Sequence, residues 1–111
     1  MTELTFNKNA FLTTLETFQT KFELESNNFT LESEASGDRF ILSAKRKDGN
    51  DIRAFGPCQV KGNPISVAFD VLDLQRSIQE THKAANVENL TLIVGDSLRV
   101  KEPLVYTITL N

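Results

Sequence analysis

The chain opens with a short alternating segment followed by an amphipathic one. Residues 4–6 alternate apolar and polar side chains, which predicts a strand. Over residues 8–21, large apolar side chains recur at the spacing of one helix face. These side chains are Phe11, Leu15, Phe18 and Phe22. Asn7 suits the N-cap of this helix, and Phe6 and Phe11 have the spacing of a hydrophobic staple. The apolar face of this helix requires a sheet to cover it.

Strand patterns follow this helix, and then the order of elements begins again. Segments with period-two alternation are separated by turn-forming residues. They span residues 29–34, 39–45 and 51–55, and Gly56 and Pro57 are expected to end the last one. The second series comprises a strand at 65–69, a helix from 71 to about 85, and strands at 90–94, 98–101 and 104–110. Asp70 is the expected N-cap of the second helix, whose apolar face carries Leu74, Ile78 and Ala85.

The two halves of the chain share apolar positions at nearly constant offset. The matched pairs are Phe6 with Phe69, Leu15 with Ile78, and Leu31 with Leu92. We therefore predict an α+β fold in one domain, 1–111, with two β-α-β-β-β pseudo-repeats at about 3–56 and 62–111. Its two helices are expected side by side on one face of a continuous antiparallel sheet. A coincidence of two common strings of elements is the alternative.

Composition supports one ordinary globular domain. The chain has 111 residues, of which 40% are hydrophobic and 24% are charged. It has no apolar run long enough to cross a membrane, and its start lacks the pattern of a secretory signal, so we expect a cytoplasmic location. Cys58 is the single cysteine and has no neighbours at metal-ligand spacing. We expect it to be a small half-buried residue.

Sequence motifs for catalysis are missing. The chain has no glycine-rich phosphate loop, nucleophile elbow or His-Glu-x-x-His helix. Glu32 and Glu34 alternate on the exposed face of a predicted strand and are expected to be solvated. His82 has no second histidine to act with and is expected at the surface. The sequence therefore predicts no enzyme, no cofactor, no metal site and no small-molecule substrate.

Positive charges that could contact nucleic acid lie at a few positions on the two predicted helices. The formal net charge of −3 argues against a protein that coats nucleic acid, because such binding requires clustered cations. Arg76, Gln79 and Lys83 nevertheless share a narrow sector of the second helix, opposite its apolar face. They are candidates for phosphate contact, with an ordinary solvated face as the alternative. The first helix has a polar outer face flanked by Lys8 and Lys21.

One run of three cations stands apart from the helices. Residues 45–47 read Lys-Arg-Lys and lead into a turn at residues 48–50. Such a run can contact nucleic acid. It is also typical of a charged hairpin end that protects a strand edge from aggregation, and we favour this second interpretation.

Taken with this order of elements, several segments resemble one domain of the DNA sliding clamps, the β subunit of bacterial DNA polymerase III and its relatives. The resemblance covers nearly the whole chain, from residues 4–15 through the segment 62–64 and the strand 65–69 to the final meander at 90–110. It implies a ring whose inner wall consists of helices facing DNA, with sheets outside that join across subunit boundaries. A chain with one such domain would need several copies or larger partners. The peptide groove of bacterial clamps lies at a domain junction, and no residue here is assigned to it.

Two functions follow as hypotheses. The first is a sliding-clamp-like accessory protein that binds duplex DNA without sequence specificity and self-associates through edge strands into a homo-oligomer. Arg76, Gln79, Lys83, Lys8 and Lys21 are its candidate DNA-binding residues. The alternative is a protein-interaction module with a clamp-like fold that does not bind DNA and uses an edge strand within residues 104–110.

Overall fold

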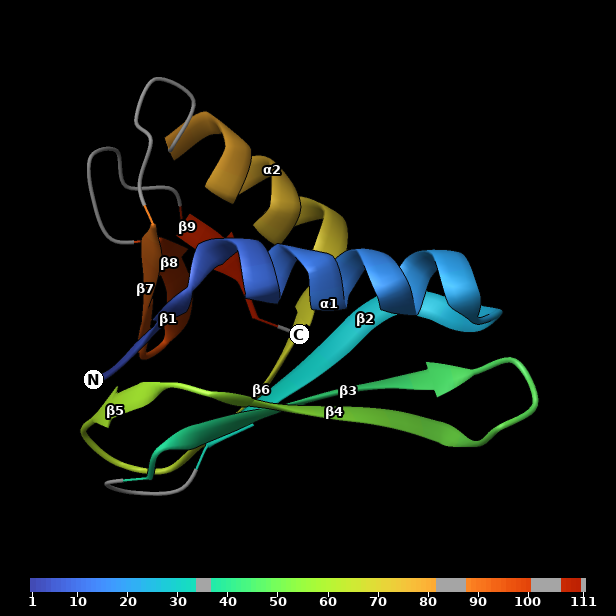
Figure 1. Cartoon of the computed structure of the whole chain (residues 1–111), viewed down its shortest axis with the longest axis horizontal. Helices are drawn as coiled ribbons and strands as arrows, with labels where there is room; N and C mark the ends of the chain where they lie inside the picture. Colours follow the sequence, from blue (N-terminus) through green and yellow to red (C-terminus); the bar gives the residue numbers. More distant parts are fainter. Residues whose placement is uncertain (34–36, 82–87, 101–106, 111) are drawn as a thin grey trace.

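A computed structural model describes residues 1–33, 37–81, 88–100 and 107–110. The order β-α-β-β-β occurs twice, with a short extra strand, β5 (Gln59–Lys61), between the two halves (Figure 1). The first half contains β1 (Thr2–Asn7), α1 (Lys8–Lys21), β2 (Leu24–Ser33), β3 (Arg39–Arg46) and β4 (Asp51–Pro57). The second half contains β6 (Ile65–Asp70), α2 (Val71–Thr81), β7 (Asn89–Val94), β8 (Ser97–Val100) and β9 (Thr107–Thr109). The predicted α+β fold class is confirmed.

Some element boundaries differ from the prediction. Strand β4 continues through Gly56 and Pro57, although we expected these residues to end it. Gly56 suits this strand because a Cβ there would lie 2.5 Å from Cε1 of Phe40. Strand β5 was not predicted, since three residues are too few to show a period. The expected end of the second helix and the start of the last strand lie outside the described residues.

The first helix begins as its local sequence predicts. The Asn7 side chain accepts a hydrogen bond from the backbone amide of Ala10 at 2.9 Å, so this residue is the N-cap. The rings of Phe6 and Phe11 lie 4.4 Å apart, which confirms the staple. Phe22 is a correction: we expected it on the buried face, but it follows the helix in an extended conformation and is 36% exposed.

The strands form two antiparallel sheets, where we expected one continuous sheet. Their orders are β4-β3-β2-β6 and β5-β1-β7-β8-β9. The first strand of each half thus pairs with the meander of the other half. Strand β5 pairs with the other edge of β1, so β1 has a strand partner on both sides.

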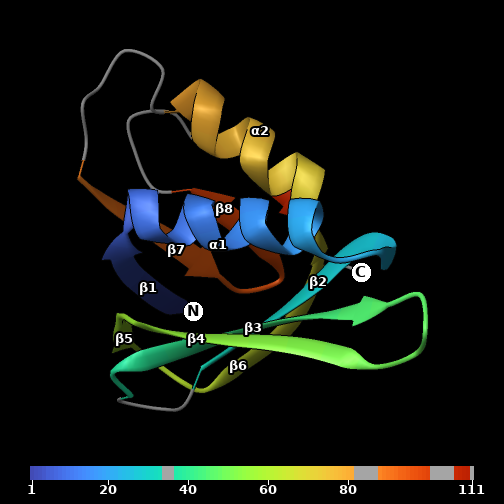
Figure 2. The same ribbon diagram turned by 45° about the vertical axis from the view of Figure 1, so that its right-hand side comes forward.

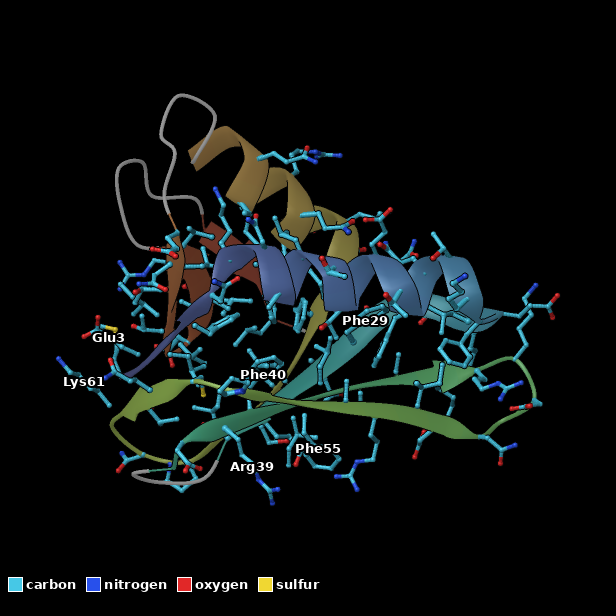
Figure 3. The ribbon with its side chains drawn as sticks, in the orientation of Figure 1. Glu3, Phe29, Arg39, Phe40, Phe55 and Lys61 are labelled. Atoms are coloured by element: carbon cyan, nitrogen blue, oxygen red, sulfur yellow. The ribbon has the colours of Figure 1, made fainter. Side chains whose placement is uncertain are left out.

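Both helices cover both sheets. Helix α1 packs on β1 and β4, and α2 packs on β2, β6 and β8. One aromatic cluster joins β1, α1 and β3, with the rings of Phe6 and Phe11 5.2 Å and 5.5 Å from that of Phe40. Phe29 and Phe40 point from the four-stranded sheet toward the helices (Figure 3). The core therefore lies between the helices and the sheets, and the outer faces of the helices are left for contacts with other molecules.

Candidate nucleic-acid interface

The two helices lie side by side and are joined by a reciprocal pair of amides. The Gln19 Nε2 atom donates to Oε1 of Gln75 at 3.3 Å, and Gln75 Nε2 donates to Oε1 of Gln19 at 2.8 Å. Both side chains are half-buried, and Figure 2 shows α1 and α2 adjacent on the same side of the four-stranded sheet. The sequence did not reveal this pair, since it joins separate elements. Its one local signal is that Gln75 lies between the buried and exposed sectors of α2.

Helix α2 presents two of its three candidate residues to solvent. Arg76 and Gln79 are exposed, while Leu74 and Ile78 are buried beneath them. Asp70 caps the helix by accepting hydrogen bonds from the amides of the residues two and three positions later. Arg76 and Gln79 lie one turn apart on one surface. The third candidate, Lys83, lies outside the described residues.

The candidates on α1 lie at its two ends. Lys8 is the first residue of the helix and is half-buried, whereas Lys21 is the last and is exposed. A helix of 14 residues places them about 20 Å apart. Between them the hydroxyls of Thr17 and Thr20 donate to carbonyls one turn earlier in the same helix. A hydroxyl has one proton to donate, so these two are engaged and cannot also donate to a phosphate.

The outer helix surface carries little positive charge. The cations of the two helices are Lys8, Lys21 and Arg76, and the carboxylates in their sequences are Glu16, Asp73 and Glu80. Three cations against three carboxylates leave no excess of positive charge. A surface with this balance attracts the phosphates of DNA weakly, because the nonspecific affinity depends on how many phosphates are neutralised.

Two of the three cations at the hairpin end, residues 45–47, lie next to other residues of the chain. Arg46 Nη2 lies 3.3 Å from a carboxylate oxygen of Asp48, and its guanidinium lies over the ring of Phe22, 5.7 Å from the centroid. Lys45 is the cross-strand partner of Asp51. These contacts agree with our interpretation of the run as a charged hairpin end.

The described residues contain no group of side chains arranged for metal binding. A cleft of about 440 Å³ opens beside Cys58, with Asn7, Asn89 and Asp38 among its lining residues. Burial is the main cause that raises the pKa of the Cys58 thiol to about 11, and the Asp38 carboxylate adds to it. The thiol is therefore protonated at neutral pH and a poor nucleophile. His82 and Glu34 fall in parts of the chain that the structure does not describe.

In the described ranges, no helix is both long enough and apolar enough to cross a bilayer. No protein-family model matches the chain, and no curated protein sequence matches it. Solved structures do match. The β subunit of DNA polymerase III from Caulobacter crescentus superimposes with a TM-score of 0.80 at 14% identity, over 100% of this chain and 30% of that one. The chain has the fold of a DNA sliding-clamp domain.

Two further clamps agree with this assignment. The sliding clamp from Bartonella birtlesii matches with a TM-score of 0.79 at 11% identity, over 99% of this chain and 32% of its own length. The clamp from Pseudomonas aeruginosa matches with a TM-score of 0.78 at 12% identity, over 99% and 30%. This chain thus spans about a third of the length of the clamps it resembles. Helices α1 and α2 of this clamp-like domain lie side by side, as predicted from the sequence.

Proposed function

We propose that this clamp-like domain is a DNA accessory protein that binds duplex DNA without sequence specificity as an assembly of several copies. The observation that carries the proposal is the reciprocal Gln19–Gln75 pair. It holds the two helices side by side, so that their outer faces form one surface. Clamps are accessory proteins with no catalytic step, and we propose the same for this chain.

Within this proposal, the residues have different tasks. Arg76 contacts phosphate oxygens through its guanidinium, and Gln79 donates an amide hydrogen bond one turn later. Lys8 and Lys21 contact phosphates farther along the backbone, because they lie at opposite ends of α1. Lys83, which lies outside the described residues, is the remaining candidate for phosphate contact. These contacts involve only the DNA backbone, which is what sequence-independent binding requires.

Self-association is part of the proposal because one copy is too small and too weakly charged. The chain spans about a third of the clamps it resembles, and its two helices carry three cations against three carboxylates. Several copies would repeat that surface around the DNA. Strand β4 has one strand partner in the described sheet, so its other edge is available for pairing with a neighbouring copy.

The first test measures molecular mass by light scattering, with and without duplex DNA, at about 50 mM and about 200 mM salt. We expect self-association and a DNA complex that weakens as salt rises. Each neutralised phosphate contributes about −0.9 to the slope of log affinity against log salt. A slope steeper than about −3 would require more cations than Lys8, Lys21 and Arg76 of one copy supply.

Variants then locate the surface. Arg76→Gln should weaken DNA binding and make the salt slope shallower, and Gln79→Ala should weaken binding with the slope unchanged. Lys61→Gln removes a charge of the same sign from β5, on another surface, and should leave both quantities unchanged. A uniform loss in all three variants would argue against an interface on the helices.

A topological test separates encirclement from simple adhesion. A closed assembly should remain on a circular duplex and slide off when one cut makes it linear, whereas an adhesive surface should bind both forms equally. A protein that stays monomeric and binds no duplex at low salt would refute the proposal. The interaction-module alternative predicts a different set of results. Self-association would not depend on salt, no DNA would bind, and Thr107→Pro would abolish the association.

A further inference from the structure

The outer face of the four-stranded sheet carries an exposed aromatic ring on the side away from the helices. Phe55 on β4 is 57% exposed, so its ring is accessible to another molecule. The guanidinium of Arg39 on β3 lies over its ring, 5.2 Å from the centroid. Figure 3 shows both side chains pointing away from α1 and α2. This surface is therefore separate from the proposed DNA interface, and the inference does not depend on it.

The strand register arranges cations on both sides of this ring. Successive outward pairs are Arg39 with Pro57, Ile41 with Phe55, Ser43 with Arg53, and Lys45 with Asp51. Arg39 thus lies one row before Phe55, and Arg53 lies one row after it. Within the described residues, no recorded ion pair involves either arginine, and the recorded one joins Arg46 to Asp48.

Carboxylates on the same face limit the site to two charges. Asp51 stands opposite Lys45 and compensates it. Glu32 is half-buried on β2 and stands opposite Ile41, on the far side from Phe55. Among the described residues, no carboxylate forms an ion pair with Arg39 or Arg53, and an apolar ring lies between these two arginines. The next row beyond Arg53, Lys45 with Asp51, has no net charge, so the positive stretch is short and favours a short acidic ligand.

We propose that the outer face of β3 and β4 binds an extended acidic segment of a partner protein, with two carboxylates flanking an apolar side chain. Arg39 and Arg53 lie two rows apart, about 13 Å along the strands. In an extended peptide, residues i and i+4 are also about 13 Å apart and point to the same side. The matching pattern is therefore acidic-x-apolar-x-acidic. The central side chain packs on Phe55 in the place that the Arg39 guanidinium occupies in the free protein, and each carboxylate accepts hydrogen bonds from one guanidinium, that of Arg39 having turned back to its own row.

The test uses the whole chain and fluorescent peptides. The probe contains Glu-Thr-Phe-Thr-Glu between Gly and Ser residues, and binding is followed by anisotropy. A second peptide, with Thr-Phe-Glu-Glu-Thr, keeps the composition and charge but changes the spacing. A third replaces both Glu by Gln. We expect the first peptide to bind at least about tenfold more tightly than either control.

Variants assign the contact. Phe55→Ala and Arg53→Gln should each weaken binding by about tenfold, as expected for central aromatic and arginine contacts. Lys61→Gln, which removes one positive charge from the other sheet, should change affinity by less than about twofold. Circular dichroism and thermal unfolding check that each variant is folded. Substitution of these exposed side chains leaves the core intact, so folded variants are expected.

Three outcomes would overturn the proposal. The first is equal binding of the two peptides with different glutamate spacing, because the site would then recognise charge alone. The second is binding that Phe55→Ala leaves unchanged. The third is no peptide binding, including the case in which an oligothymidylate binds in a Phe55-dependent manner. That last result would assign the surface to single-stranded nucleic acid.

Discussion

Substitution of Gln19 and Gln75, singly and together, should reveal a coupling energy between the two side chains. Each single substitution alone should have a small effect on stability. Gln19 and Gln75 exchange hydrogen bonds of 2.8 Å and 3.3 Å, and both residues are half-buried. A hydrogen bond of good length is worth about 1 kcal/mol net, and the longer one contributes less because 3.3 Å exceeds the preferred range. We therefore expect a coupling energy of about 1 kcal/mol between the two side chains.

A double-mutant cycle measures this energy. Gln19→Ala, Gln75→Ala and the double variant are unfolded in urea, and a coupling of about 1 kcal/mol corresponds to a midpoint difference of about 0.5 M. A matched cycle pairs Gln19→Ala with Gln79→Ala, the same residue type one turn later and exposed. That cycle should give no coupling. Additive effects in both cycles would show that the pair does not hold the helices together, and would remove the main support for the shared helix surface.

Two further predictions concern the core and the thiol. Gly56→Ala should destabilise the protein by about 1–3 kcal/mol, because its Cβ would lie 2.5 Å from the packed ring of Phe40. Gly95→Ala, whose Cβ meets the flexible Met1 side chain at 3.2 Å, is the control, and equal losses in urea unfolding would contradict the argument. The pKa of Cys58 is raised from 9.0 to about 11, so burial of the neutral thiol stabilises the fold below pH 9. This contribution should be lost as pH rises from 9 to about 11, and Cys58→Ala should lack that component in a pH series of unfolding curves.

Local features of the fold could be predicted because their physics is contained in a few consecutive residues. The Asn7 cap and the Phe6–Phe11 staple involve neighbouring turns, and both were correct. The period of apolar residues located both helices for the same reason. Phe22 has the correct period but follows the last helical residue, so periodicity alone could not exclude it. Its ring packs instead against Phe18 and the guanidinium of Arg46.

Contacts between elements could not be predicted from the sequence. The helical sector of Arg76 and Gln79 follows from 3.6 residues per turn, and both are exposed as expected. Their roles in DNA binding stay predictions. The Gln19–Gln75 pair depends on how α1 and α2 approach each other, which no period encodes. The outward direction of Phe55 was available from alternation along β4, but its contact with Arg39 depends on the register between two strands.

The division into two sheets explains how the halves can share geometry with little shared sequence. The ladder of β1 with β7 and the ladder of β6 with β2 join apolar residues at corresponding positions. The pairs are Phe6 with Leu90 and Leu4 with Leu92 in the first ladder, and Phe69 with Phe29 and Val67 with Leu31 in the second. Both ladders are buried on one side, and any large apolar side chain can fill these buried positions. Since the first strand of each half completes the sheet of the other, neither complete sheet is built from one half. The hydrophobic period must therefore persist in both halves, whereas the identity of the side chains is free to change.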